Sequence, residues 1–108
     1  MGDEEKILFA NEAFYAAFAT ADMHAMDALW ARDHPVSVVH PGAMVTLGRA
    51  EVMDSWASIL GDAKSFDIAF RAPITRLQGA AALVLCYERV GAHSLIATNV
   101  FVREEESW

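Results

Sequence analysis

The chain has 108 residues, of which 55% are hydrophobic, and its formal net charge is −7. This length is typical of one domain, and this hydrophobic content is too high for a disordered chain. Eight basic residues are scattered among fifteen acidic ones, so the chain lacks the basic face that nucleic-acid binding requires. The acidic runs at positions 3–5 and 104–106 are interpreted as solvated ends.

Cysteine content and the N-terminal sequence bear on the compartment. Cys86 is the only cysteine, so no disulfide can form within the chain, which fits a reducing compartment. The N-terminal residues MGDEEKILF carry acids where a secretory signal would carry basic residues. No apolar run approaches the roughly 20 residues that a membrane-spanning helix needs. We therefore expect a cytoplasmic protein with neither a membrane nor a nucleic acid as partner.

Three helices are predicted from apolar residues that recur at helical spacing. The first runs from about residue 3 to residue 20 and contains Leu8, Phe14, Tyr15 and Phe18. The second begins after Asp22, a good N-cap residue, and ends before Pro35, because the residue before a proline avoids the α region. The third starts near Arg49 and ends at Gly61, which suits a C-terminal cap.

The remaining segments predict strands. Residues 36–40 and 44–47 flank the turn signal Pro41-Gly42 and indicate a hairpin. Residues 66–75 alternate between apolar and polar, residues 81–90 form a more continuous apolar run, as in a central strand, and residues 94–103 alternate again. The alternation places Phe66, Ile68, Phe70, Ala72 and Ile74 on one face. Helices first and strands last predict an α+β fold, with three helices on one face of an antiparallel sheet.

Five short pieces occur in an order and spacing that are characteristic of one superfamily. They are Phe14-Tyr15, Asp22 with Ala28-Leu29-Trp30, His40-Pro41-Gly42, Gly48-Arg49, and the stretch 97–101 with sequence ATNVF. Together they resemble the nuclear transport factor 2-like (SnoaL-like) superfamily, and the resemblance covers residues 7–108. The resemblance implies a cone-shaped, cystatin-like α+β roll whose curved sheet and helices enclose a pocket. Its members include ketosteroid isomerase, polyketide cyclases, dehydratases, dioxygenase small subunits and non-catalytic association domains, so it does not choose a function.

The resemblance also implies a strand that this sequence does not contain. In similar proteins an acidic or glycine turn followed by Trp opens a final long strand, which pairs with the first strand in mid-sheet. The printed sequence stops at Trp108. We therefore expect residues 1–108 to form a single domain that lacks this strand. Either the sequence is truncated or a neighbouring chain fills the gap.

His40 is the first candidate for chemistry. It precedes Pro41, at the point where the resemblance to ketosteroid isomerase implies the Asp general base. A histidine has an ordinary pKa near 6.5 and can exchange protons at neutral pH. A positioned base typically contributes about 10²–10⁴ in rate. The alternative is a structural histidine at the end of a strand, bonded to a backbone carbonyl.

Asn99 is the second candidate. The resemblance places it where ketosteroid isomerase carries a protonated Asp that donates to the oxyanion. An Asn amide can donate without needing a raised pKa. The alternative is an Asn that is satisfied by local backbone or a helix end. Phe14 falls where that enzyme has its oxyanion Tyr and cannot donate, while Tyr15 lies about 100° round the helix, so the isomerase constellation is incomplete.

A pocket and the absence of a cofactor complete the expected site. Six aromatic residues are predicted to line the pocket, with plain core packing as the alternative: Phe14, Tyr15, Phe18, Trp30, Trp56 and Phe101. Arg49 is expected to make a structural ion pair or cap. The four histidines show no metal-ligand spacing and the chain has no glycine-rich phosphate loop, so neither a metal nor a cofactor is expected.

Two functions compete. One is a cofactor-free isomerase, cyclase or dehydratase that binds a small apolar or carbonyl-containing molecule. In it, His40 would take a proton from the carbon next to the carbonyl and Asn99 would bond the enolate oxygen. The other is a non-catalytic ligand-binding or dimerisation and association module. Helices cover only one face of the sheet, so we also expect a homodimer through the other face.

Overall fold

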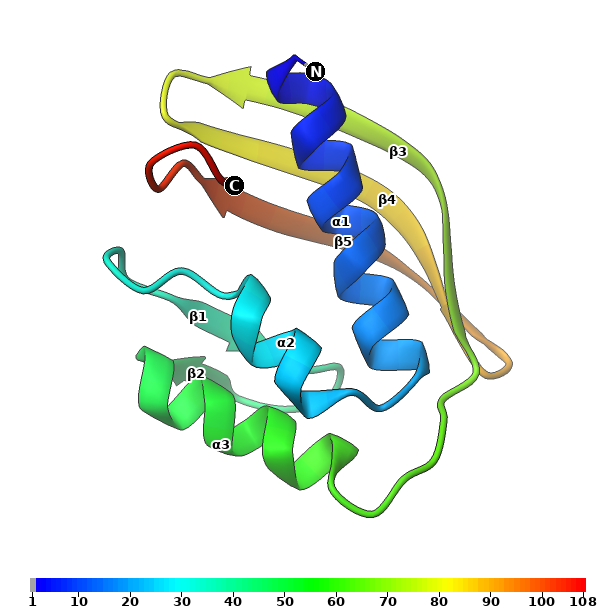
Figure 1. Ribbon diagram of the computed structural model, residues 1–108. Coiled ribbons are helices and arrows are strands. Elements are labelled where there is room, and N and C mark those ends of the chain that lie inside the picture. The colour runs from blue at the N-terminus through cyan, green and yellow to red at the C-terminus, as the bar shows by residue number, and fades with distance from the viewer. Residues whose placement is uncertain (1) are drawn as a thin grey trace.

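The computed structural model describes residues 2–108 and confirms the α+β class. Figure 1 shows the three helices preceding the three long strands in the chain, with a short hairpin between the second and third helices. The elements are α1 (Asp3–Ala19), α2 (Met23–Leu29), β1 (Ser37–Val39), β2 (Val45–Leu47), α3 (Arg49–Leu60), β3 (Ile68–Gln78), β4 (Ala81–Val90) and β5 (His93–Val102).

Local chemistry sets the helix ends as the sequence predicts. The Asp22 carboxylate accepts a hydrogen bond of 3.0 Å from the backbone N–H of Ala25 and so caps α2. α3 ends at Gly61, where an added Cβ would lie 2.8 Å from the carbonyl oxygen of Ala57. A larger residue at position 61 would therefore push against the last turn of its own helix.

The strands form two antiparallel sheets. β3, β4 and β5 make a meander, whereas β1 and β2 form a separate two-stranded hairpin. The free edges of β1 and β5 face each other, and Figure 1 shows them on opposite sides of an interval that no described strand fills. Residues of both edge strands line a hollow between the two sheets.

One face assignment from the sequence is wrong. The register between β3 and β4 shifts between Arg71 and Ile74, where Ala72 has a φ of 53° and Pro73 has no N–H to donate. The extra residues turn Ile74 to the outer face, where it is 55% exposed, rather than to the face that Ile68 shares. The alternation of apolar and polar residues in the sequence does not reveal a bulge of this kind.

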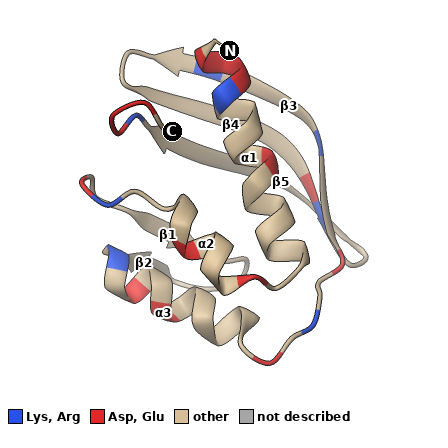
Figure 2. Ribbon diagram, in the orientation of Figure 1, with Lys and Arg blue, Asp and Glu red and all other residues tan. Residues whose placement is uncertain are grey.

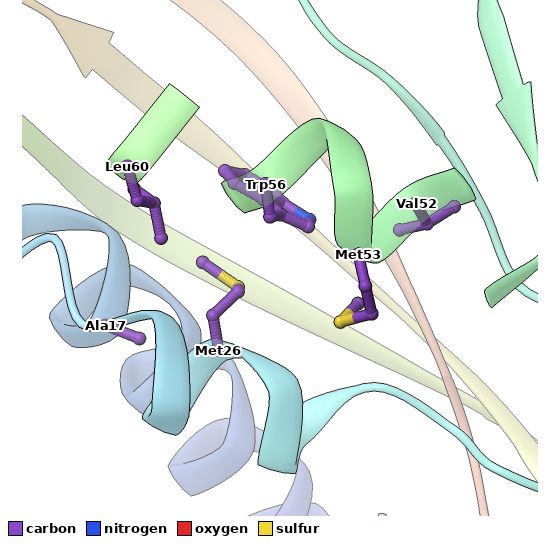
Figure 3. Close-up of a cluster of buried hydrophobic side chains, with 6 residues drawn as sticks. All are labelled: Ala17, Met26, Val52, Met53, Trp56 and Leu60. Carbon is purple, nitrogen blue, oxygen red and sulfur yellow. The ribbon is translucent and has the colours of Figure 1, made fainter. Parts of the chain in front are cut away.

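The helices divide between the two sheets. α1 packs across β3 and β4, while α2 and α3 pack on each other, and α3 also packs on the hairpin. Figure 3 shows Met26 of α2 reaching toward α3, beside Trp56 and Leu60. These three side chains are at most 2% exposed, so their burial stabilises the packing of α2 against α3. The two helices form part of one wall of the hollow.

Acidic residues are distributed unevenly over the fold. Figure 2 shows acidic residues at the start of α1 and in the loop after β5, while β1 and β5 carry none. Among residues 2–108, no helix has both the length and the apolar character that a membrane span requires.

Candidate functional site

A cavity of about 670 Å³ lies between the helices, β1 and β5. Side chains of α1, α2 and α3 form its helical wall, and nearly every residue of β1 and β5 contributes to the opposite sides. The lining is mostly apolar, with a few polar side chains among them. A volume of this size and this character suits a small organic molecule.

Five of the six predicted aromatic residues line this cavity: Phe14, Phe18, Trp30, Trp56 and Phe101. The ring of Phe14 stands edge-on to Trp56 at 5.6 Å between centroids, and Trp30 lies 6.3 Å from Trp56. Tyr15 is the exception. It lies one position further round α1, is 3% exposed, and stacks on Phe70 of β3 at 4.7 Å, behind the cavity wall.

His40 follows β1 and lines the cavity, with its ring edge-on to Trp56 at 4.8 Å. Its Nε2 lies 3.0 Å from the Ser55 hydroxyl, which donates its only hydrogen to the carbonyl oxygen of Val52 over 2.7 Å. The hydroxyl can therefore only accept from His40, so Nε2 carries the hydrogen and Nδ1 keeps the lone pair. Burial lowers the pKa of His40 below its ordinary 6.5. At neutral pH, His40 is thus a neutral base.

Asn99 of β5 also lines the cavity, but its amide nitrogen is engaged within the protein. Nδ2 donates to Asn11 Oδ1 over 2.8 Å and to the Tyr15 hydroxyl over 3.2 Å. Asn11 is fully buried, and its own Nδ2 has no partner among the described residues. In this arrangement the N–H groups of Asn99 point into the wall, and its oxygen is the polar atom left for a ligand.

Tyr15 connects this amide pair to a carboxylate. Its hydroxyl donates to Glu88 Oε2 over 2.6 Å and lies 3.4 Å from the Cys86 sulfur. Burial first, and then the contacts with Cys86 and Glu88, raise the pKa of Tyr15 well above its usual range. The phenol therefore keeps its proton. Glu88 itself lines the cavity, so the network reaches the site at two points, Glu88 and Asn99.

A family model described as a SnoaL-like domain matches residues 7–108. The chain belongs to this family. A solved structure from Streptomyces avermitilis, provisionally named a dehydratase of the NTF2-like family, is 33% identical, with a TM-score of 0.85 over 98% of this chain and 88% of the other. No curated protein sequence matches the present chain.

Other similar structures carry different names. One from Thiobacillus denitrificans, provisionally named a calcium/calmodulin-dependent protein kinase type II association domain, is 35% identical, with a TM-score of 0.79 over 92% of this chain and 84% of the other. An LEH-like epoxide hydrolase of M. tuberculosis is 19% identical, with a TM-score of 0.63 over 95% of this chain and 77% of the other. The latter likeness concerns the fold alone. The range of names agrees with a fold that serves several functions.

The sequence alone does not identify two polar residues of the site in this SnoaL-like domain, Asn11 and Glu88. Asn11 lies in an alanine-rich helix, and Glu88 follows a run of apolar residues in its strand, so each is a polar residue beside apolar ones. That signal marks a buried polar contact, since an unpaired polar group inside a core is costly. It does not identify the partner, because Tyr15 and Glu88 are 73 positions apart.

Arg49 makes the structural contacts that the sequence predicts for it. Its guanidinium donates to the Asp27 carboxylate over 3.1 Å and to the backbone oxygens of Asp27 and Ala31. The pair ties the start of α3 to the end of α2, next to Trp30. Arg49 therefore braces the helical wall of the SnoaL-like domain, and it does not line the cavity.

Proposed function

We propose that this SnoaL-like domain binds a small, largely apolar carbonyl compound in the cavity, and that His40 removes a proton from the carbon next to the carbonyl. The observation that carries the proposal is the neutral imidazole at the cavity wall. Its Nε2 is held by Ser55, which leaves Nδ1 as the basic nitrogen. A fixed tautomer beside an apolar cavity is what a general base requires.

The proposed step needs no cofactor. The C–H bond breaks, its proton moves to Nδ1 of His40, and the electron pair delocalises onto the carbonyl oxygen. In an isomerisation or cyclisation the imidazolium returns the proton to another atom. In a dehydration the neighbouring C–O bond breaks, and the departing hydroxide takes that proton and leaves as water.

Hydrogen–deuterium exchange tests the proton transfer without knowledge of the natural substrate. α-Tetralone, an apolar ketone with exchangeable hydrogens next to its carbonyl, is incubated with the protein in D₂O and followed by NMR. We expect exchange at least about 100-fold faster with the wild type than with His40→Gln. His93→Gln is the matched control, because His93 is exposed and lies outside the cavity lining. Saturable binding of the ketone without accelerated exchange would overturn the catalytic proposal.

A second role in self-association has its own support. The outer face of the β3–β5 sheet carries exposed apolar side chains, among them Ile74, Tyr87, Ile96 and Val100, which are between 46% and 73% exposed. No helix packs there among the described residues, since α1 lies on the other face. Several exposed apolar side chains on one face are typical of an interface. We propose that two copies pair through it and form a homodimer.

A further inference from the structure

Glu88 fixes the direction of the hydrogen bonds that join Tyr15, Asn99 and Asn11 between α1 and the sheet. A carboxylate can only accept, so the single hydrogen of the Tyr15 hydroxyl points at Glu88 across 2.6 Å. The Tyr15 oxygen must then accept from its next neighbour, which forces Asn99 to turn Nδ2 toward it. Nδ2 also meets Asn11, which must present its oxygen. The orphaned Nδ2 of Asn11 is the consequence of this directed chain.

The cavity consequently meets hydrogen-bond acceptors. Asn99 offers Oδ1, and Glu88 offers the carboxylate oxygen that Tyr15 does not use, neither of which has a partner among residues 2–108. His40 also lines the cavity, and its Nδ1 keeps a lone pair. Asn99 and Glu88 stand on the same face of the adjacent strands β5 and β4, because Asn99 is opposite Val84 and Glu88 is opposite Leu95. They form one polar edge in an apolar cavity.

We propose that this edge binds a hydroxyl group, so that the ligand of the cavity is an apolar molecule carrying an alcohol or phenol that donates to Asn99 Oδ1 or to Glu88. A carbonyl oxygen alone would find no N–H of Asn99 to bond. The inference rests on the proposed function in taking this cavity as the ligand site.

Tyr15 is the positioning residue of this arrangement. It does not touch the cavity, yet its hydroxyl is the reason that Asn99 faces the ligand with oxygen. Without that hydroxyl both amides can turn over. Asn11 Nδ2 would then donate to Asn99 Oδ1, and Asn99 would present N–H to the cavity. The preference of the site would change from ligands that donate to ligands that accept.

A matched pair of naphthalene ligands, with binding measured by calorimetry, tests the polarity. 2-Naphthol and 2-acetonaphthone share one ring system, but only the first donates a hydrogen bond. We expect the wild type to bind 2-naphthol about threefold to tenfold more tightly, the worth of one hydrogen bond. Equal binding, or tighter binding of the ketone, would overturn the inference and leave the cavity as a ligand site. If neither probe binds, the inference and the proposed function both fail.

Tyr15→Phe then tests the cause. We expect the preference for 2-naphthol to disappear or reverse in this variant. Ile68→Val is the control, because Ile68 packs in the same buried cluster as Tyr15 but makes no contact with the amide chain. It should weaken packing and keep the preference. A preference that survives in a folded Tyr15→Phe would show that the hydroxyl does not set the polarity. The wild-type comparison decides the proposal by itself if that variant does not fold.

Discussion

Tyr15 on α1 and Glu88 on β4 are joined by a hydrogen bond of 2.6 Å between residues 73 positions apart. The bond anchors the first helix to the central strand. It also lies directly behind the cavity wall, so one contact serves both the packing of the helix and the orientation of Asn99.

The stability of the protein should depend on this bond. We expect Tyr15→Phe to lower the free energy of unfolding by about 1–2 kcal/mol, because it removes the partner of a carboxylate and of an amide. Tyr87→Phe is the matched control, since Tyr87 lies on the outer face and is 46% exposed. Urea denaturation of both variants measures the difference. Similar losses in the two variants would mean that the buried bond contributes nothing particular.

His40 should make the stability fall on mild acidification. Its pKa is lowered in the folded protein, so below pH 6.5 the unfolded chain binds the proton first. The contribution of neutral His40 to the free energy of unfolding is therefore fully present above pH 6.5. It is lost as the pH falls through 6.5 toward the pKa of His40 in the folded protein. We expect His40→Gln to flatten this part of the curve of melting temperature against pH. His93→Gln should leave it in place. The rate of hydrogen–deuterium exchange catalysed by His40 should increase as the pH rises through the same range, and should be constant at higher pH.

Glu104 should govern a second, more acidic range. Its carboxylate accepts from His34 Nδ1 and from the backbone N–H groups of Arg32 and Asp33, at 2.8–3.0 Å. The His34 contact first, and then the two backbone contacts, lower its pKa from 4.5 to about 2. This stability is present above pH 4.5 and is lost as the pH falls toward 2. The melting temperature should fall less between pH 4.5 and pH 2 for Glu104→Gln than for Glu105→Gln. Glu105 is the control because its side chain is exposed. Identical curves would contradict the role of Glu104.

The outer face of the sheet should control self-association. Ile96 is 73% exposed on this face, so Ile96→Lys would place a charge within the proposed dimer contact at little cost to folding. We expect sedimentation velocity at tens of micromolar to give a dimer for the wild type and a monomer for Ile96→Lys. Met44→Lys, in the hairpin turn and 86% exposed, should remain dimeric. A monomeric wild type would refute the proposed interface.

Periodicity in the sequence determines much of the fold, because the spacing of apolar residues along a helix or strand is a local property. It predicts all three helices and the strands β3 to β5 close to their observed bounds. The residue type of Asp22 predicts its cap, and the family resemblance implies the structural contacts of Arg49. Strand alternation also puts Asn99 and Phe101 on one face of β5, and both line the cavity.

Tertiary structure decides what those residues offer to a ligand. Whether Asn99 presents nitrogen or oxygen depends on Tyr15, and Tyr15 in turn on Glu88, through bonds between segments far apart in the chain. The tautomer of His40 likewise depends on Ser55, on another element. The bulge before Ile74 turns that residue outward although the alternation of the strand continues. Sequence spacing carries the direction of a side chain within its own element, whereas the direction of a hydrogen bond is set by whichever partner the fold brings to it.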